Sequence, residues 1–462
     1  MQSIYNAIEA FVGWYWGIPI LIILIGGGIA LTAIIGGVQF SRLGFIFKHT
    51  LGTIFNKEEQ ARKKAAGITP LETAIVALGG TVGTGNIVGV GAAIAAGGPG
   101  ALFWMWVCGF LAMAIKYCEV VASVAYRQKV EDGSYRSGPY MYIKDGLRSK
   151  PLAAIFGVLM LVTLSIICSV HASAITSNLA AIGVSHYITC GILSVFVVLI
   201  IFGGMKELVK ITNVMVPFMC VFYIICALIV VFANIGSIGA VFASIFKGAF
   251  TGQAAIGGFA GAAVSATIRN GLARGVFSND AGLGASATMQ SQAEAIDHPA
   301  QQGMWAVMET FIDTIVICTL TGLLILFSGS WTAGGDGSTF SAAALGSVLG
   351  VVGQYGCTIS LVLFGLSSLV GVVETVKVQA ISMFRKEKIG VMFQWLVFAL
   401  VIAGCLSNIR SIFLFVDFAN GFVLLINIGS LCLLGKTLRR LSREWFGNNG
   451  DLAAIARSRA EK

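Results

Sequence analysis

The sequence predicts an all-α, polytopic membrane protein of about eleven transmembrane helices. Of its 462 residues, 57% are hydrophobic and only 11% are charged, whereas soluble proteins carry about 25% charged residues. Hydropathy separates about eleven segments near 20 residues long, the length that crosses a bilayer. The net charge of +9 lies in short loops and in the tail. This distribution is typical of the positive-inside pattern and does not indicate a nucleic-acid-binding face.

Taken in order, the chain opens with a short helix over residues 1–16, whose aromatic side chains suit the headgroup region of a bilayer. A first apolar span is predicted at residues 18–40. The further spans are predicted at residues 71–97, 101–126, 152–179, 186–202, 211–233, 262–290, 303–327, 356–383, 391–406 and 413–434. Residues 235–251 are expected to connect the two sets of five spans on the outside.

Lysine and arginine gather in alternate connections, at residues 42–64, 127–150, 206–210, 385–388 and 436–443. Cytoplasmic loops carry such an excess, which predicts an outside N-terminus and a cytoplasmic C-terminus in a bacterial-type plasma (inner) membrane. Two sets of five spans have opposite orientations, so we expect inverted repeats. The chain then divides into an N-terminal segment (1–70), a first repeat (71–234), a second repeat (235–435) and a cytoplasmic tail (436–462).

The first helix of the first repeat is predicted to be broken. Its glycines cost roughly 1 kcal/mol each in a helix relative to alanine, and polar residues lie among them; the stretch includes Gly79, Gly80, Thr81, Gly83, Thr84, Gly85, Asn86, Gly89 and Gly91. Non-helical backbone at membrane depth is tolerated where it lines a cavity. A tight link at residues 97–100 then leads to the next helix. The alternative is that the glycines serve close helix packing.

The first helix of the second repeat carries polar residues in mid-span, at Phe277–Asp280, between glycines. Two interrupted segments at corresponding positions of two repeats indicate a transporter site. Backbone N–H groups near Thr84, Gly85 and Asn86 suit a carboxylate, although Asn86 is equally a candidate cap for the outer half-helix. The carbonyls of Gly79 and Val82, freed by unwinding, suit a sodium ion.

The segments ALGGTVGTGNIVGVGAAIAAGGPGALFWMW (77–106) and ARGVFSNDAGLGASA (273–287) resemble the alanine or glycine:cation symporter family. The resemblance extends over nearly the whole chain. It implies a LeuT-type fold of five plus five helices with an extra N-terminal helix. It also implies import of a small neutral amino acid together with sodium by alternating access.

The resemblance also assigns site residues. Ser367 and Ser368 are expected to complete a sodium site with the first broken helix, or else to bond to their own helix carbonyls. Phe277 and Ser278 are expected to line the substrate pocket, with Phe277 covering the substrate or serving only in packing. Asp280 is a membrane-embedded acid and so a candidate for coupling; alternatively it caps a half-helix or pairs with Arg274 or Arg269.

The sequence departs from the family pattern at two places. His171 stands where the family has glutamine, and Val372 stands where it has tryptophan, followed by Glu374. Valine leaves room for a larger substrate, while His171 and Glu374 add groups for a polar substrate or for proton coupling. The alternatives are that His171 bonds to a neighbouring helix and that Glu374 pairs with Lys377.

Other acidic and basic residues lie within the predicted spans. Lys116 and Glu119 are three apart on one helix, so they are expected to neutralise each other. Glu309 and Asp313 are predicted to be buried acids, and the sequence assigns them no role.

Other function classes find less support in the sequence. The chain lacks a GxxxxGK[ST] loop, so ATP-driven pumping is not expected. The ten cysteines form no CxxC pair, and the four histidines fall in separate regions, so we expect neither an enzyme nor a cofactor other than the cotransported sodium ion. The expected partners are an amino acid, sodium and the lipid bilayer. The alternatives are a cation-coupled carrier of a larger or polar amino acid, driven by protons, or a channel.

Overall fold

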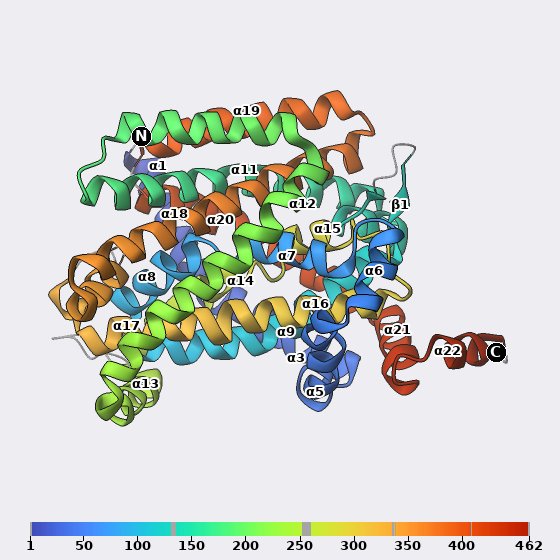
Figure 1. The fold of residues 1–462 in the computed structure, drawn as a ribbon, viewed down its shortest axis with the longest axis horizontal. Helices are drawn as coiled ribbons and strands as arrows, with labels where there is room; N and C mark the ends of the chain where they lie inside the picture. The colour runs from blue at the N-terminus through green and yellow to red at the C-terminus, as the bar shows by residue number, and fades with distance from the viewer. Residues whose placement is uncertain are drawn as a thin grey trace.

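The computed structural model describes residues 2–130, 135–251, 260–334, 337, 339–407 and 409–460. These residues are almost entirely helical (Figure 1). The strands in the described part are β1 (Gln128–Lys129) and β2 (Tyr135–Arg136), which pair antiparallel. The predicted all-α class is therefore confirmed.

Nine helices of the described part are long and apolar enough to cross a membrane, and one bent pair of helices makes a tenth span. The first span, Asn6–Ile35, runs through α1 (Gln2–Tyr15), α2 (Ile18–Leu21), η1 (Ile22–Gly26) and α3 (Gly27–Ile35). The others lie in α9 (Gly100–Ala125), α11 (Lys150–Ala181), α12 (His186–Ala233, two spans), α16–η6–α17 (Pro299–Thr310, Phe311–Cys318, Thr319–Ser328), α18 (Phe340–Phe384), α19 (Glu387–Cys405) and α20 (Ile409–Leu433).

Three predicted boundaries differ from the structure. Most of the short helix predicted at residues 1–16 belongs to the first span. The predicted loop between the spans 186–202 and 211–233 is helical, because α12 continues through it. The predicted helix 356–383 begins earlier, since α18 starts at Phe340 and bends at Gly350, where φ is 61°. Glycine tolerates this left-handed conformation without a steric cost.

Both predicted helix breaks are present. The first is a bend of 55° between α7 (Pro70–Thr81) and the run of η3 (Thr84–Asn86) and α8 (Val88–Gly97). The second separates α14 (Ala260–Asn279) from α15 (Ala285–Gln290). Asp280, Gly282 and Gly284 all have positive φ in this second break, at 59°, 83° and 83°. Such residues end one helix and turn the chain before the next one begins.

Shorter elements connect or extend the long helices. These are α4 (Val38–Ser41), α5 (Leu43–His49), η2 (Leu51–Phe55), α6 (Lys57–Ala65), α10 (Pro139–Met141), η4 (Tyr142–Gly146), η5 (Ile235–Ser237), α13 (Ile238–Thr251), η7 (Ser330–Ala333), α21 (Gly435–Gly447) and α22 (Leu452–Ala460). In Figure 1 the basic segments α5, α6 and α21 lie at the right-hand end, whereas α13 and α17 lie at the left-hand end. These three basic segments therefore lie toward the same end of the molecule.

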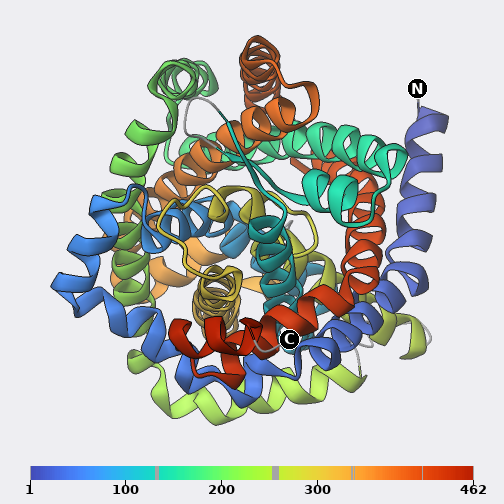
Figure 2. The ribbon, with the colours of Figure 1, turned by 90° about the vertical axis from the view of Figure 1, so that its right-hand side faces the viewer.

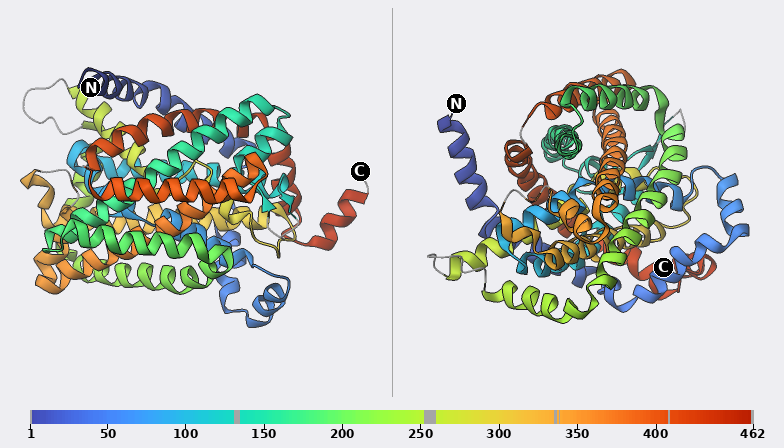
Figure 3. Two further views of the ribbon diagram at one scale, coloured as in Figure 1. Left: turned by 90° about the horizontal axis from the view of Figure 1, so that it is seen from above. Right: turned by 60° about the vertical axis from the view of Figure 1, so that its left-hand side comes forward.

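The two termini lie at opposite ends of the long axis, and α22 projects from the basic end (Figures 1 and 3). Figure 2 looks along this axis from the basic end and shows several helices end-on. The broken helices contact both sets of neighbours: α7 packs on α12, α15, α16 and α18, while α14 packs on α8 and α9. The breaks are thus enclosed by protein.

The predicted link at residues 97–100 brings two backbones into contact. Gly98 has a φ of 70° and ends α8, and Gly100 begins α9. A Cβ atom at Gly100 would overlap the backbone of Gly248 and Ala249 in α13. Only glycine permits this approach of α13 to the start of α9.

We predict that Gly100→Ala destabilises the protein by about 1–3 kcal/mol, the usual cost of overpacking. The matched control is Gly429→Ala in α20, where an added Cβ would meet nothing within 4 Å; this change should be neutral, or stabilising by up to about 1 kcal/mol. Thermal unfolding of the purified protein measures both variants. Equal melting temperatures for the two variants would contradict the close approach.

Candidate functional site

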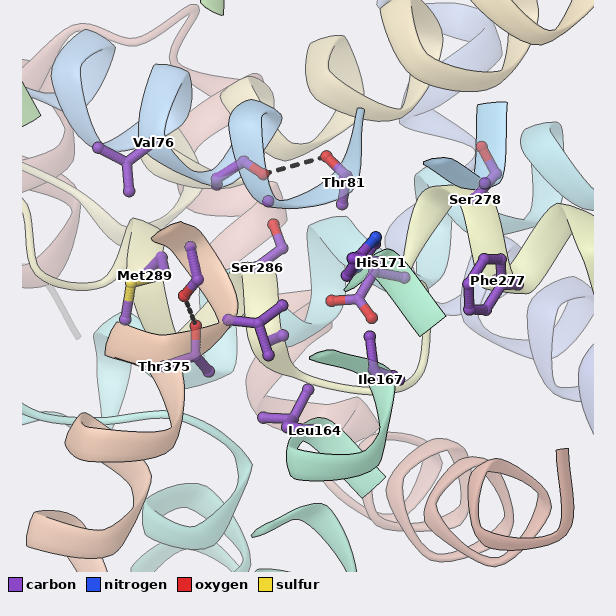
Figure 4. Close-up of a pocket in the computed structure, with 17 residues that line it drawn as sticks. Val76, Thr81, Leu164, Ile167, His171, Phe277, Ser278, Ser286, Met289 and Thr375 are labelled. Carbon is purple, nitrogen blue, oxygen red and sulfur yellow. Dashed lines mark hydrogen bonds between the residues drawn. The ribbon is translucent and has the colours of Figure 1, made fainter. Parts of the chain in front are cut away.

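A buried cavity lies where the two broken helices cross. Its lining comes from α7 and η3 (Val76, Ala77, Gly80, Thr81, Gly85), from the second broken helix (Phe277, Ser278, Asp280, Ala285, Ser286, Met289), from α11 (Leu164, Ile167, His171) and from α18 (Gly371, Val372, Thr375). His171, Phe277 and Ser278 lie at one end of this space, and Val76 and Met289 lie at the other (Figure 4). The cavity volume is about 30 Å³, which is room for one or two water molecules.

The cavity brings together most of the predicted substrate residues. Gly85, His171, Phe277, Ser278 and Val372 line it. Asp280, the predicted coupling residue, also lines it. Thr84, Asn86 and Glu374 are outside the lining, although Thr84 contacts the lining residue His171.

His171 joins α11 to the first break. Its Nδ1 lies 2.9 Å from Oγ1 of Thr84, and its ring stacks on Phe277 with 6.4 Å between the ring centroids. The two interpretations of His171 from the sequence, a group at the substrate site and a hydrogen bond to a neighbouring segment, are therefore compatible. The same side chain bonds to a neighbouring segment and faces the cavity.

Asn86 holds the first break from within. Its Oδ1 accepts from the N–H of Gly83 at 2.9 Å, and its Nδ2 donates to Oδ1 of Asp313 at 2.7 Å. The second carboxylate oxygen of Asp313 accepts from Ser278 at 2.9 Å and from Thr314 at 2.8 Å. Asp313 thus links both helix breaks. The sequence signalled only that an acid lies in an apolar span.

The four predicted sodium ligands lie together. Oγ of Ser367 is 3.5 Å from the carbonyl oxygen of Val82, and Oγ of Ser368 is 3.4 Å from that of Gly79. Both hydroxyls also donate to the carbonyl of Phe364, at 2.9 and 3.0 Å. The alternative role, bonding within α18, therefore coexists with the contact to the first break.

This cluster has no carboxylate. Across the described residues, there is no group of three or more histidine, cysteine or acidic side chains that could hold a metal ion. A cation at this place would be held by neutral carbonyl and hydroxyl oxygens, a ligand set that suits a hard monovalent ion better than zinc.

The direct ion pair of Lys116 is formed with Glu309 and not with the predicted partner Glu119. Nζ of Lys116 lies 2.6 Å from Oε1 of Glu309, while Glu119 accepts a hydrogen bond from Asn427 at 2.5 Å. The reason is that α9 is surrounded by other helices, among them α14, α16 and α20. Residues three apart on it therefore meet different neighbours.

Glu309 connects the inner parts of both broken helices. Its Oε1 accepts from Thr81 of α7 at 2.8 Å, and its Oε2 accepts from Ser286 and Gln290 of α15 at 2.6 and 2.5 Å. Glu309 is 3% exposed. The acid to which the sequence assigned no role is thus hydrogen-bonded on both oxygens next to the cavity.

Arg274 pairs with Asp417 of α20 and not with Asp280. Its guanidinium lies 4.5 Å from the ring centroid of Phe413, which in turn contacts Phe277 edge-on at 4.9 Å. Asp280 instead takes a left-handed φ, and its N–H donates to the carbonyl of Val276 at 2.8 Å. The ion pair and Phe413 therefore lie behind Phe277, which lines the cavity.

Glu374 and Val372 lie on opposite sides of α18. Glu374 accepts a hydrogen bond from Nε2 of Gln394 in α19 at 3.3 Å, while Lys377 approaches Glu387 at 3.9 Å. The structure therefore turns Glu374 away from the cavity and does not pair it with Lys377. Val372 does face the cavity, which it lines together with Leu164, Ile167 and Met289.

Comparisons with known proteins agree on one family. The profile of the sodium:alanine symporter family matches residues 1–452. An uncharacterized transporter of Bacillus subtilis (strain 168), YflA, is 38% identical over 450 residues, covering 96% of this chain and 94% of that protein. The sodium/alanine symporter AgcS of Methanococcus maripaludis is 37% identical over 387 residues, covering 80% of this chain and 81% of AgcS.

A solved structure of MhsT in complex with L-phenylalanine matches with a TM-score of 0.60. The match covers 83% of this chain and 95% of MhsT, at 16% sequence identity. A likeness at this identity concerns the fold alone. It confirms the LeuT-type arrangement of the helices.

We predict that Arg274→Met destabilises the protein by about 3–5 kcal/mol, because it leaves the Asp417 carboxylate without its cation. Arg274 and Asp417 side chains are only 11% and 13% exposed. The double variant Arg274→Met/Asp417→Asn should recover most of this loss, since it removes both charges. Melting temperatures of the single and double variants measure the difference; a double variant no more stable than the single one would contradict the pairing.

Proposed function

The chain belongs to the sodium:alanine symporter family, and from this premise we propose that it imports a small neutral amino acid together with sodium. The observation that carries the proposal is the meeting of two helix breaks at one buried cavity. Freed backbone groups at such breaks bind ions and charged substrate groups. The family and its relatives are transporters, so this multi-pass membrane protein is a transporter.

The first break offers donors for the substrate carboxylate. In the part of the chain that the structure describes, the N–H groups of Thr84 and Gly85 donate to no backbone carbonyl. A Cβ at Gly85 would lie 3.1 Å from the ring of Phe277 and from Cα of Ser278. A larger residue at this place would fill the approach to these donors. In this conformation the cavity has room for only one or two water molecules, so it has to widen to take even a small amino acid.

Sodium is proposed to bind the carbonyls of Gly79 and Val82 and the hydroxyls of Ser367 and Ser368. These oxygens are buried and come from α7, its C-cap and α18. One inward positive charge contributes about 2.3 kcal/mol per 100 mV of membrane potential. At 1.4 kcal/mol per tenfold, this supports about 40-fold accumulation of a neutral substrate.

The arrangement of the cavity supports alternating access. Arg274, Asp417 and Phe413 lie behind the lining residue Phe277, whereas the lining continues along α7 and α15, to Val76 and Met289. That direction leads to the basic end in Figure 1. With the basic end assigned to the cytoplasm, the N-terminus lies outside, the C-terminus lies inside, and this conformation is closed to the outside.

His171 favours a second candidate, a carrier of a polar amino acid that is coupled to protons. The ring lines the cavity while Nδ1 is bonded to Thr84. A histidine in this position can bond to a substrate side chain or carry a proton. Glu374 does not support this candidate, because it faces α19.

Uptake into proteoliposomes tests the proposal directly. Labelled alanine and glycine should accumulate when an inward sodium gradient is imposed, and not when potassium replaces sodium. Uptake driven by a pH gradient alone, or of a polar amino acid only, would favour the second candidate. Absence of gradient-driven uptake of any amino acid would refute both.

We predict that Ser367→Ala and Ser368→Ala each raise the sodium concentration for half-maximal uptake roughly tenfold. This assumes that each hydroxyl contributes about 1.4 kcal/mol to the binding of sodium. Ser360→Ala is the matched control, because Ser360 is buried on the same helix and its hydroxyl bonds to Gly356. It should leave the sodium dependence unchanged. Equal sodium dependence in all three variants would argue against the serine site.

A further inference from the structure

The second helix break contains a buried ammonium group. Nζ of Lys116, on α9, donates to the carbonyl oxygen of Asn279 at 2.8 Å, and Lys116 is 0% exposed. Asn279 is the last residue of α14. Its carbonyl therefore belongs to the helix end that carries a partial negative charge and attracts cations.

Acidic groups surround this ammonium. Glu309 lies 2.6 Å away and is itself bonded to Thr81, Ser286 and Gln290. Glu119 lies three residues after Lys116 on α9 and is buried, and Asp280 directly follows Asn279 in the chain and lines the cavity. Without the lysine, these carboxylates and the Asn279 carbonyl would form a buried, negatively charged site of oxygen atoms that could bind a cation.

The first break has similar carbonyls but a different partner. Gly79 and Val82 face the neutral hydroxyls of Ser368 and Ser367 at 3.4 and 3.5 Å. Within the described residues, neither carbonyl accepts a hydrogen bond from a lysine or arginine. Among the described residues, the second break thus holds a cation belonging to the chain, and the first break holds none.

We propose that the Lys116 ammonium is a tethered cation that occupies the second break, so that only the first break takes a mobile cation. One sodium ion would then accompany each substrate molecule. The inference rests on the proposed sodium coupling. The ratio of one sodium ion to one substrate molecule follows because a tethered ammonium stays bound through the whole transport cycle, whereas a cotransported ion has to leave.

Equilibrium binding of radioactive sodium to the purified, full-length protein tests this inference. The wild type is expected to bind one ion. Lys116→Ala removes the ammonium and opens room beside Glu309 and Asn279, so it is expected to bind one ion more than the wild type. Lys116→Arg keeps the charge and should bind the same number as the wild type.

A double variant separates a new cation site from general loosening of the fold. Lys116→Ala/Glu309→Gln lacks both the ammonium and the nearest carboxylate, so its count should return to that of the wild type. Melting temperature gives a second readout, since a bound ion stabilises the folded state. Sodium should raise the melting temperature of Lys116→Ala more than that of the double variant.

Two results would overturn the inference. One is an unchanged count in folded Lys116→Ala, and the other is a second sodium ion bound to the wild type. In the latter case a single ion bound to Asp313→Asn would assign the second ion to Asp313. If Lys116→Ala does not fold at any sodium concentration, the number of sodium ions bound to the wild type tests the inference by itself: one ion supports it, and two ions overturn it. A wild type that binds no sodium, with a gain of one ion in Lys116→Ala, would support the tethered cation and contradict the proposed sodium coupling.

Discussion

A helix that breaks inside a membrane frees backbone N–H and C=O groups, and these need partners from the protein because lipid offers none. The centre of this protein is organised by that requirement. Asn86 serves the first break by accepting from Gly83, and Asn279 serves the second by accepting from the N–H of Ala281 at 3.1 Å. Other partners come from α9, α18 and η6. Each break therefore fixes the helices around it, and the cavity results from this arrangement.

The sequence was sufficient to predict most of the helices, their two breaks and the cluster formed by Gly79, Val82, Ser367 and Ser368. These features have local signals, namely apolar length, glycine among polar residues, and a motif that resembles a known family. The sequence was not sufficient to predict the partners of buried charges. Lys116 and Glu309 are 193 positions apart, and Arg274 and Asp417 are 143 apart. Local spacing favours a neighbour on the same helix, whereas helix crossing decides the actual partner.

The helix boundaries likewise depend partly on local sequence and partly on contacts with other helices. Lys206 and Lys210 predicted a loop, but α12 stays helical there and also through Gly203 and Gly204. A glycine costs a helix only about 1 kcal/mol, which packing against α18 and α7 offsets. At Gly350 the backbone does bend, because φ is positive. Composition alone does not distinguish these two outcomes, since both depend on which neighbours the segment meets.

The Lys116–Glu309 pair has a consequence for the biogenesis of the protein. The ribosome completes α9 long before it reaches Glu309, and at about 5–20 residues per second the 193 residues between them take roughly 10–40 s. During this interval the lysine of α9 has no carboxylate from α16, and an unpaired lysine at the centre of a bilayer costs about 2.5–3.5 kcal/mol even on the scale of the insertion machinery. Release of α9 into lipid is therefore expected to be slow until α16 arrives, so that insertase contacts or a transient interfacial position shelter the helix while the second half of the chain is made.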